Sequence, residues 1–304
     1  MKAIEVNNLK KSYGTVEALK GINFDASKGE ILGIIGPDGS GKTTLFRILT
    51  TLLLADAGAA SVLGYDLLKD YQVIRRNIGY MPGKFSLYQD LTIEENLTFF
   101  ATLFNTTIEE NYHLIEGIYK QIEPFKDRRA GKLSGGMKQK LALCCALIHK
   151  PEILFLDEPT TGVDPVSRKE FWEMLKDLKK QDICILVSTP YMDEASMCDR
   201  IAFIQEGQFL DIDSPEQIIK KFKGRLLAVE ASELFSLLHT MRQIDGVISC
   251  FAFGENLHAV VQDGLSEEAL HSILIQKGYS NLKIEEITPS IEDCFMQITG
   301  DIHE

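Results

Sequence analysis

The stretch that most constrains this chain is Gly36-Pro37-Asp38-Gly39-Ser40-Gly41-Lys42-Thr43, which matches G-x-x-x-x-G-K-[ST] at every specified position. An apolar run, Ile31 to Ile35, precedes it, and a helix-like run, Thr44 to Leu49, follows it. This context predicts a phosphate-binding loop, because glycines let successive N–H groups point inward and the helix dipole adds positive charge. We expect Lys42 to reach the β and γ phosphates and the Thr43 hydroxyl to ligate Mg²⁺. The alternative is a glycine-rich turn that binds nothing.

Composition limits the classes of function that remain. With 304 residues, 45% of them hydrophobic, the chain can form one large and one small globular domain. A net charge of −12 argues against a nucleic-acid partner, which requires a basic face. No apolar run approaches the ~20 residues needed to span a bilayer, and the start of the chain has no signal-peptide core. The six cysteines lack metal-site spacing, so we expect buried thiols in a reducing compartment.

A second feature is the apolar run Ile153 to Leu156, which ends in Asp157 and Glu158. An uninterrupted apolar strand is typical of the centre of a parallel sheet, and the carboxyl edge of such a sheet is where α/β proteins bind ligands. Asp157 therefore suits a Mg²⁺ partner. Glu158 suits a general base that orients and deprotonates water for attack on a γ-phosphate. The alternative is a pair of solvated acids at a strand end.

The segment between these two features is predicted to be a mostly helical insert. A strand-like run, Val73 to Tyr80, leads into a loop, Met81 to Phe85. A capping box then opens a helical pattern that continues, with interruptions, over Thr92 to Ile122. The sequence Leu133-Ser134-Gly135-Gly136-Met137 stands before a helix, Lys138 to Ile148. Free N–H groups at this helix start could also bind an anion.

The rest of the chain predicts two domains, residues 1–222 and 223–304. Ser167 to Lys180 reads as a helix and Asp182 to Ser188 as a buried strand, and alternation of strand and helix indicates a parallel sheet. From Arg225 onward the pattern is strand, helix, strand, strand, helix, strand, which is ferredoxin-like. His258 and His271 are isolated in the sequence, so we expect binding or dimerisation here rather than catalysis.

Four motifs follow one another in an order that resembles the nucleotide-binding domain of ABC transporters. They are the phosphate loop, then Leu133 to Met137, then Ile153 to Glu158, and last Thr161-Gly162-Val163-Asp164. The resemblance spans residues 2 to 222. It implies an α/β P-loop NTPase fold with a helical insert. A single such domain with a small α+β tail resembles the ATPase subunit of a multidrug or related exporter. Its implied place is the cytoplasmic face of the cell membrane, beside a membrane-spanning permease subunit.

The resemblance also implies roles for individual residues. In this family two domains face each other head to tail, and the signature of one completes the ATP site of the other. The implied positions are Tyr13 on adenine, Gly36 to Thr44 on the phosphates and Mg²⁺, Asp157 on the metal, Glu158 as catalytic base, Ser134 and Gly136 on the partner's γ-phosphate, and Asp164 at the dimer interface. For Tyr13, plain surface packing beside the turn glycine Gly14 is the alternative.

Two positions depart from the family pattern. Gly83 stands where the family usually has a glutamine that senses Mg²⁺ and γ-phosphate, and Gln89 cannot be assumed to replace it. Pro190 stands where the family usually has a histidine that holds the γ-phosphate, and proline offers neither an imidazole nor an N–H. Because loss of one transition-state donor typically costs ~10²–10³ in rate, we expect this chain's own site to bind ATP but turn over slowly. The alternative is neutral drift compensated by neighbours.

Three functions follow. The leading one is an energy-coupling ATPase for export, docked on its permease through Phe85 to Thr92 and paired with a second ATPase, either an identical chain or a histidine-bearing partner. The second is a regulatory subunit that binds nucleotide and hydrolyses little. The third, a DNA-repair or translation ATPase, requires long coiled coils or tandem domains, which this acidic chain lacks. The sequence does not identify a transported substrate.

Overall fold

The computed structural model describes residues 2–231 and 233–300, which divide into two compact units, one up to Pro215 and the other from Glu216. The domain boundary expected after residue 222 lies a few residues further along the chain and stays a prediction. Each unit is described by itself below. No helix within the described residues is both long enough and apolar enough to cross a membrane.

The first unit is built on a largely parallel sheet with the strand order β10-β9-β3-β8-β7-β6, in which only the β9–β10 pair is antiparallel. Its strands are β3 (Ile31–Ile35), β6 (Ile78–Met81), β7 (Ile153–Asp157), β8 (Cys184–Thr189), β9 (Arg200–Gln205) and β10 (Gln208–Asp213). Every residue of β3, β7 and β8 is buried. The prediction of buried, central parallel strands is therefore confirmed.

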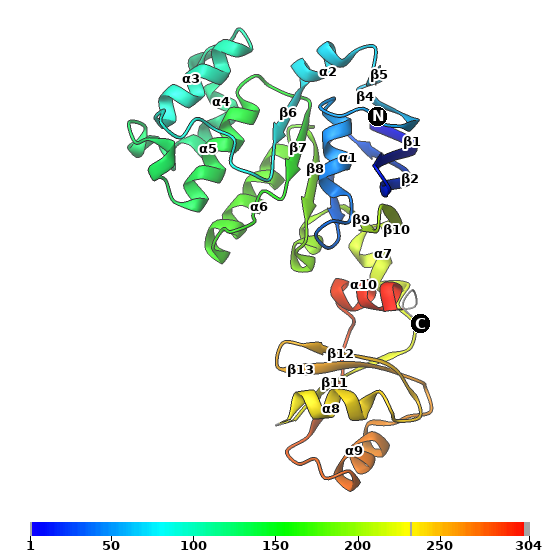
Figure 1. Cartoon of the computed structure of the whole chain (residues 1–304). Coiled ribbons are helices and arrows are strands. Elements are labelled where there is room, and N and C mark those ends of the chain that lie inside the picture. Colours follow the sequence, from blue (N-terminus) through cyan, green and yellow to red (C-terminus); the bar gives the residue numbers. More distant parts are fainter. Residues whose placement is uncertain (1, 232, 301–304) are drawn as a thin grey trace. The chain divides into compact units, whose positions relative to one another are not determined.

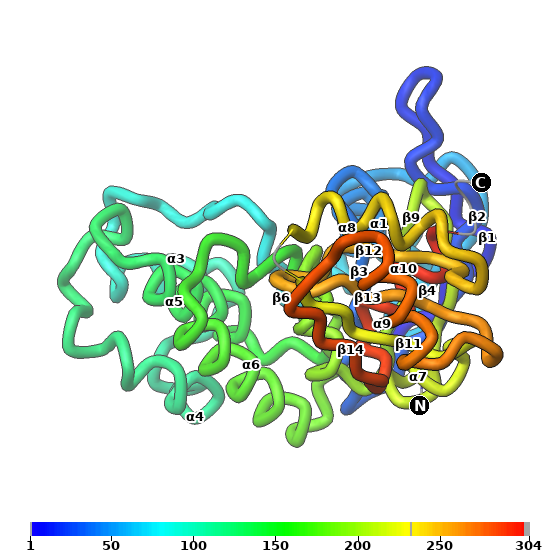
Figure 2. The backbone as a smooth tube through the Cα atoms, turned by 90° about the horizontal axis from the view of Figure 1, so that it is seen from below, coloured from blue at the N-terminus to red at the C-terminus, as the bar shows by residue number. Residues whose placement is uncertain are grey.

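A second sheet of the first unit is antiparallel, with the order β2-β1-β4-β5. Its strands are β1 (Lys2–Tyr13), β2 (Val16–Ser27), β4 (Ala57–Val62) and β5 (Tyr65–Asp66). The turn between β1 and β2 projects away from the rest of the unit (Figure 2). Tyr13 lies at this turn, where 48% of its surface is exposed.

The helices of the first unit fall into two groups. Figure 1 shows α3, α4 and α5 gathered in one helical lobe, whereas α1 lies beside the strands of the parallel sheet. The α-helices up to residue 215 begin and end at α1 (Lys42–Leu49), α2 (Tyr71–Asn77), α3 (Ile93–Leu103), α4 (Ile108–Tyr119), α5 (Gly135–Leu147) and α6 (Pro165–Lys179). Short 3-10 helices are η1 (Glu123–Phe125), η2 (Ala130–Lys132) and η3 (Met192–Met197). Complete capping boxes at Thr92 and Thr107 start α3 and α4.

One prediction in this region was wrong. The run from Val73 to Tyr80 does not form a strand throughout, because its first part belongs to α2 and only its end belongs to β6. In α2 Ile74 is fully buried while Val73 is 37% exposed, so a single apolar side chain fastens the helix to the core. Arg75 and Arg76 lie in its last turn, where positive charge favours a helix.

Helix α1 is packed directly on strand β7. Phe46 of α1 and Phe155 of β7 are both fully buried, and their rings meet edge to face with centroids 5.9 Å apart. Aromatic pairs of this geometry add about 0.5–1.5 kcal/mol beyond the area that they bury. The contact fixes the helix that follows the phosphate loop against the strand that ends in Asp157.

All six cysteines are buried and free, as predicted. Burial raises the pKa of Cys184 to about 12, and burial likewise raises the pKa of Cys250 to about 12. These thiols are therefore neutral at pH 7 and have no part in the site described below.

The second unit forms an antiparallel sheet with the order β12-β13-β11-β14. Its elements are α7 (Pro215–Lys220), β11 (Arg225–Glu230), α8 (Leu234–Met241), β12 (Val247–Phe253), β13 (Asn256–Val261), α9 (Glu267–Gln276), β14 (Lys283–Glu286) and α10 (Ile291–Gly300). This element order and pairing confirm the ferredoxin-like prediction. His258, isolated in the sequence, is not isolated in space, since its Nδ1 lies 2.6 Å from Asp293 Oδ1 and its ring stacks on Phe253.

Candidate nucleotide-binding site

The phosphate loop leaves β3 at the carboxyl edge of the parallel sheet and enters α1. Gly41 caps the helix with φ 110°, a conformation that favours glycine. A Cβ atom on Gly41 would lie 2.5 Å from the Ala18 carbonyl oxygen, and one on Gly36 would lie 2.0 Å from the Ile204 carbonyl oxygen. Glycine is therefore required at both positions by close backbone approach, which explains the motif in this chain.

Lys42 lies at the start of α1 with its side chain 3% exposed. Its Nζ donates hydrogen bonds to the carbonyl oxygens of Gly36 (2.8 Å) and Pro37 (3.0 Å). The same atom is 3.5 Å from Glu158 Oε1 and 3.9 Å from Asp38 Oδ1. The ammonium group is thus held over the loop, with a carboxylate beside it.

The loop fits a phosphate group. Ser40 is buried, and its Oγ has no hydrogen-bond partner among the residues that the structure describes. A buried, unpaired hydroxyl costs free energy unless a ligand satisfies it. The first turn of α1, which contains Thr43, carries no acidic side chain that would compete with an anion for the N–H groups at the helix start.

Asp157 and Glu158 end the neighbouring strand β7. Asp157 is buried, and its Oδ1 accepts a hydrogen bond of 2.6 Å from Ser188 Oγ. The Glu158 N–H donates to both the carbonyl oxygen and the Oγ of Ser188, each at 3.0 Å. Glu158 has φ 51°, a left-handed conformation that is strained for a residue with a Cβ atom and is often found at functional sites. Ser188 thus fixes both carboxylate residues.

The two positions that depart from the family pattern lie at this same edge. A Cβ atom on Gly83 would lie 3.1 Å from the Asp157 carbonyl oxygen and 3.8 Å from Glu158 Cβ. Pro190 follows Thr189, which is paired with Ile35, the residue before the phosphate loop. Gln89 lies beside η2, where its carbonyl oxygen accepts a hydrogen bond from the Gly131 N–H.

The Leu133 to Met137 signature lies in the helical lobe, at the start of α5. Ser134 caps this helix, and its Oγ accepts a hydrogen bond of 3.3 Å from the Met137 N–H. A Cβ atom on Gly136 would lie 2.6 Å from Ser167 Oγ, so glycine allows α5 to approach α6. Leu133 and Gly136 are buried, whereas Ser134 and Gly135 are exposed, and the contact of Ser134 and Gly136 with a partner stays a prediction.

Asp164 and Tyr13, the two other residues with predicted roles, lie at the start of α6 and at the turn between β1 and β2. Asp164 caps α6, where its Oδ1 accepts a hydrogen bond of 3.0 Å from the Ser167 N–H. This bond lowers the pKa of the exposed Asp164 carboxyl. Tyr13 lies with its ring centroid 5.9 Å from Lys11 Nζ. The interface role of Asp164 and the adenine role of Tyr13 stay predictions.

Sequence reasoning missed the polar residues that hold the edge together. Ser188 and Thr189 are fully buried at the end of β8, and Glu194 is 2% exposed in η3. The available signal was the change from apolar to polar side chains at the end of an otherwise apolar strand. Nothing local in the sequence pointed to Glu194.

The parallel sheet, the phosphate loop and the two carboxylates at its edge define a P-loop nucleoside triphosphatase. The family model described as ABC transporter matches residues 19–161. Nod factor export ATP-binding protein I of Rhizobium sp. (strain N33) is 34% identical over 98% of this chain and 97% of its own length. Linearmycin resistance ATP-binding protein LnrL of Bacillus subtilis (strain 168) is 32% identical, with 98% of each chain covered.

A further relative is longer. The probable multidrug ABC transporter ATP-binding protein YbhF of Escherichia coli (strain K12) is 36% identical over 98% of this chain, which spans about half (52%) of that relative. Among solved structures, an ATP-binding subunit of an ABC transporter is 28% identical with a TM-score of 0.66, covering 72% of this chain and 93% of its own. A dimeric post-hydrolysis state of the cassette MJ0796, bound to ADP and Pi, is 26% identical with a TM-score of 0.63, covering 69% and 98%.

The chain therefore belongs to the ATP-binding proteins of the ABC transporter family. The predicted fold and the resemblance to ATP-binding subunits of the exporter class are confirmed.

Proposed function

We propose that this chain binds MgATP at its phosphate loop and hydrolyses it with Glu158 as catalytic base, as the energy-coupling subunit of an exporter. The observation that carries this proposal is the convergence of Lys42, Asp157 and Glu158 at one sheet edge, with Lys42 Nζ 3.5 Å from Glu158 Oε1. Relatives named for export, multidrug transport and drug resistance support the transport role.

In this proposal the residues at the sheet edge act without any rearrangement of the main chain. Lys42 exchanges its bonds to the Gly36 and Pro37 carbonyl oxygens for bonds to phosphate oxygens. Glu158 orients a water molecule and accepts its proton. Among the described residues no cluster of three or more His, Cys, Asp or Glu side chains could hold a metal ion. Thr43 and Asp157 would instead hold Mg²⁺ together with the phosphates, where the ion offsets their negative charge.

A second ATPase domain would complete the site. Ser134 and Gly136 of the signature would face the γ-phosphate bound by that partner, and Asp164 would lie at the interface between them. The dimeric structures of the MJ0796 cassette support pairing of this kind. The partner is either an identical chain or a second, different ATPase.

Gly83 favours pairing with a second, non-identical ATPase rather than with an identical chain. A Cβ atom on Gly83 would lie 3.8 Å from Glu158 Cβ, so the glutamine that the family usually has would place its amide beside the catalytic residue, and glycine provides no such group. Pro190 likewise has no imidazole. We therefore propose a heterodimer in which this chain's own site turns over slowly, while its intact signature completes an active site on the partner. The second candidate function, a regulatory subunit with negligible hydrolysis, is favoured by the same two positions.

The rate of ATP hydrolysis by Pro190→His tests this slow-site proposal. We expect its turnover to exceed that of the wild type by about tenfold or more, because a restored donor stabilises the charge that develops on the γ-phosphate. The Pro190→Ala variant is the control for loss of the proline ring. Steady-state ATPase assays and ATP affinity are measured on all three proteins. Brisk wild-type turnover that Pro190→His does not increase would contradict the slow site and favour a homodimer.

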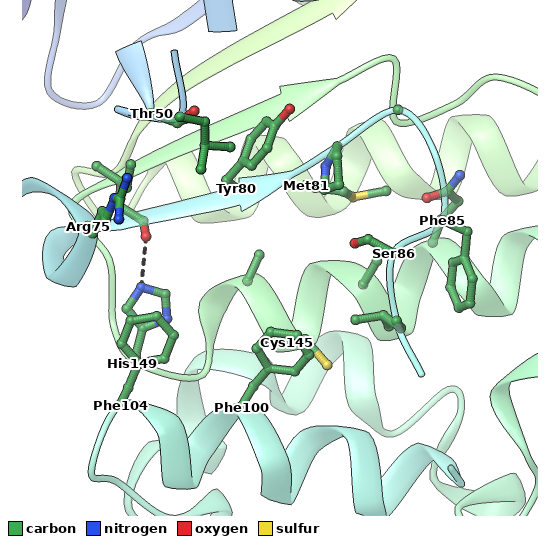
Figure 3. A pocket seen from close by; sticks show the side chains of 18 residues that line it. Thr50, Arg75, Tyr80, Met81, Phe85, Ser86, Phe100, Phe104, Cys145 and His149 are labelled. Atoms are coloured by element: carbon green, nitrogen blue, oxygen red, sulfur yellow. Dashed lines mark hydrogen bonds between the residues drawn. The ribbon is translucent and has the colours of Figure 1, made fainter. Parts of the chain in front are cut away.

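The permease would dock in a groove beside the Phe85 to Thr92 segment. Figure 3 shows Phe85, Phe100 and Phe104 around this groove of about 310 Å³. His149 stacks on Phe104 and contacts the Ile78 carbonyl oxygen through Nε2 at 2.9 Å. Burial lowers the pKa of His149, so this ring is uncharged at pH 7, while a basic side chain, Arg75, also lines the groove. Such a groove suits the apolar face of an amphipathic helix.

Because Gly83 also lines this groove, a docked helix would lie close to the turn that carries Glu158. The proposed location, on the cytoplasmic face of the cell membrane, follows from this partner. A nucleic-acid partner remains disfavoured by the net charge of −12.

Substitution of Phe85 by Glu tests the docking site. We expect the fraction of the chain that sediments with membranes from its cell of origin to fall about tenfold, because a charge at the centre of an apolar contact removes most of its binding energy. Phe125→Glu is the matched control, since Phe125 is 39% exposed and does not line the groove. Equal losses in both variants, or none in Phe85→Glu, would contradict docking here.

A further inference from the structure

Glu194 is a buried carboxylate that joins two turns of the sheet edge. It lies in η3, and its side chain is 2% exposed. Its Oε1 accepts a hydrogen bond of 2.7 Å from Thr160 Oγ1, and its Oε2 accepts one of 2.6 Å from Thr189 Oγ1. A buried carboxylate is costly unless it is paired, and here both oxygens are engaged by residues from different strand ends.

The two turns are those on which the proposed reaction depends. Thr160 follows Glu158 by two positions in the turn after β7, and Thr189 directly precedes Pro190 in the turn after β8. We propose that Glu194 is a positioning residue that holds these two turns in a fixed relation. The inference rests on the proposed function for one premise, which is that both turns face the nucleotide.

The direction of the hydrogen bonds gives Glu194 a specific task. Thr189 Oγ1 accepts a bond of 3.1 Å from the Tyr191 N–H, and this bond spans Pro190, which has no N–H of its own. A hydroxyl has one proton, and an ionised carboxylate can only accept. The Thr189 hydroxyl therefore donates its one hydrogen to Glu194 Oε2, and its oxygen lone pairs remain available to accept from the Tyr191 N–H. The shape of the turn at Pro190 depends on this orientation.

Arg168 of α6 completes the arrangement. Its Nη2 lies 3.1 Å from Glu194 Oε1, and it also pairs with Asp193 at 3.1 Å. Its guanidinium carbon lies 4.4 Å from the ring centroid of Tyr191. Arg168 Nε also donates a hydrogen bond of 3.2 Å to Glu194 Oε1, the oxygen that accepts from Thr160. An uncharged amide at position 194 would donate as well as accept, and could reverse the Thr189 hydroxyl.

Hydrogen exchange of the full chain without nucleotide tests the coupling. Thr189→Val and Thr160→Val each remove one hydroxyl at nearly constant volume, and Thr189→Ser retains it. We expect each valine variant to accelerate exchange about threefold or more in both segments, residues 156–163 and 186–196. The double variant should not exceed the larger single effect, because one link has been broken twice. Thr189→Ser should exchange at the wild-type rate in both segments. Glu194→Gln should accelerate exchange as Thr189→Val does.

The opposite pattern overturns the inference. If each valine variant changes only its own segment, or if the two effects add, Glu194 does not couple the turns. Single-turnover hydrolysis provides the second measurement, in which Thr189→Val should lower the rate constant about tenfold with ATP affinity unchanged, since misplacement affects geometry more than binding. An unchanged rate also overturns it. If the wild type neither binds nor hydrolyses ATP, the proposed function is wrong, and the exchange data still decide the coupling.

Discussion

The Glu158→Gln variant should retain ATP binding and lose hydrolysis by about 100-fold to 10,000-fold, the usual contribution of a general base. Glutamine has the same shape as glutamate but cannot accept the proton of the attacking water. The main chain should stay in place, because the two hydrogen bonds to Ser188 come from the backbone N–H of residue 158. Single-turnover hydrolysis of ATP, measured beside equilibrium binding, separates the two effects.

The control for this variant is Glu170→Gln, the same chemical change on α6, where Glu170 pairs with Lys140 at 2.7 Å. Both variants should be measured in wild-type and Pro190→His backgrounds, so that the loss is visible even where the native rate is low. Hydrolysis that survives Glu158→Gln in both backgrounds would exclude this residue as the base.

The Lys42→Met variant should lose ATP affinity by about 100-fold or more. In the proposed complex the Lys42 ammonium group exchanges two hydrogen bonds to neutral carbonyl oxygens for bonds to charged phosphate oxygens. Hydrogen bonds to charged groups contribute about 1.5–3 kcal/mol each, where 1.4 kcal/mol is tenfold in affinity. Methionine keeps most of the side-chain volume and introduces no charge at this buried position. Isothermal titration calorimetry with MgATP gives the affinity of both proteins directly.

Lys140→Met serves as its control, because Lys140 lies on α5 in the helical lobe and makes an ion pair of its own. Thermal unfolding of Lys42→Met is required beside the titration, since the variant also removes the partner of Glu158. A folded Lys42→Met protein with an affinity within about twofold of the wild type would show that the loop does not hold phosphates in the proposed way.

The sequence predicted those parts of the site that are encoded locally. The phosphate loop requires glycines at fixed spacing, and β7 is apolar up to Asp157, so both are readable from a few consecutive residues. Ser188 and Glu194 could not be found in this way, because their partners Asp157 and Thr160 lie more than thirty positions away. Contacts of this kind exist only once the parallel strands are side by side.

The same distinction explains the errors in the fold. The run from Val73 to Tyr80 has a strand-like composition, yet its first part forms α2 because helical geometry buries Ile74 on the core. His258 appeared isolated because Asp293, its contact at 2.6 Å, belongs to the last helix of the second unit. The departures at Gly83 and Pro190 were visible in the sequence, but only the structure places Gly83 against Glu158.

The left-handed backbone of Glu158 lowers the stability of the fold at the residue that supplies the proposed catalytic carboxylate. A residue with a Cβ atom in this conformation typically costs about 1–3 kcal/mol, which glycine would not incur. Directed evolution for heat resistance alone would therefore favour variants that discard the carboxylate. Stabilised forms of this ATPase should be sought by selecting for turnover at every round, with position 158 left unchanged.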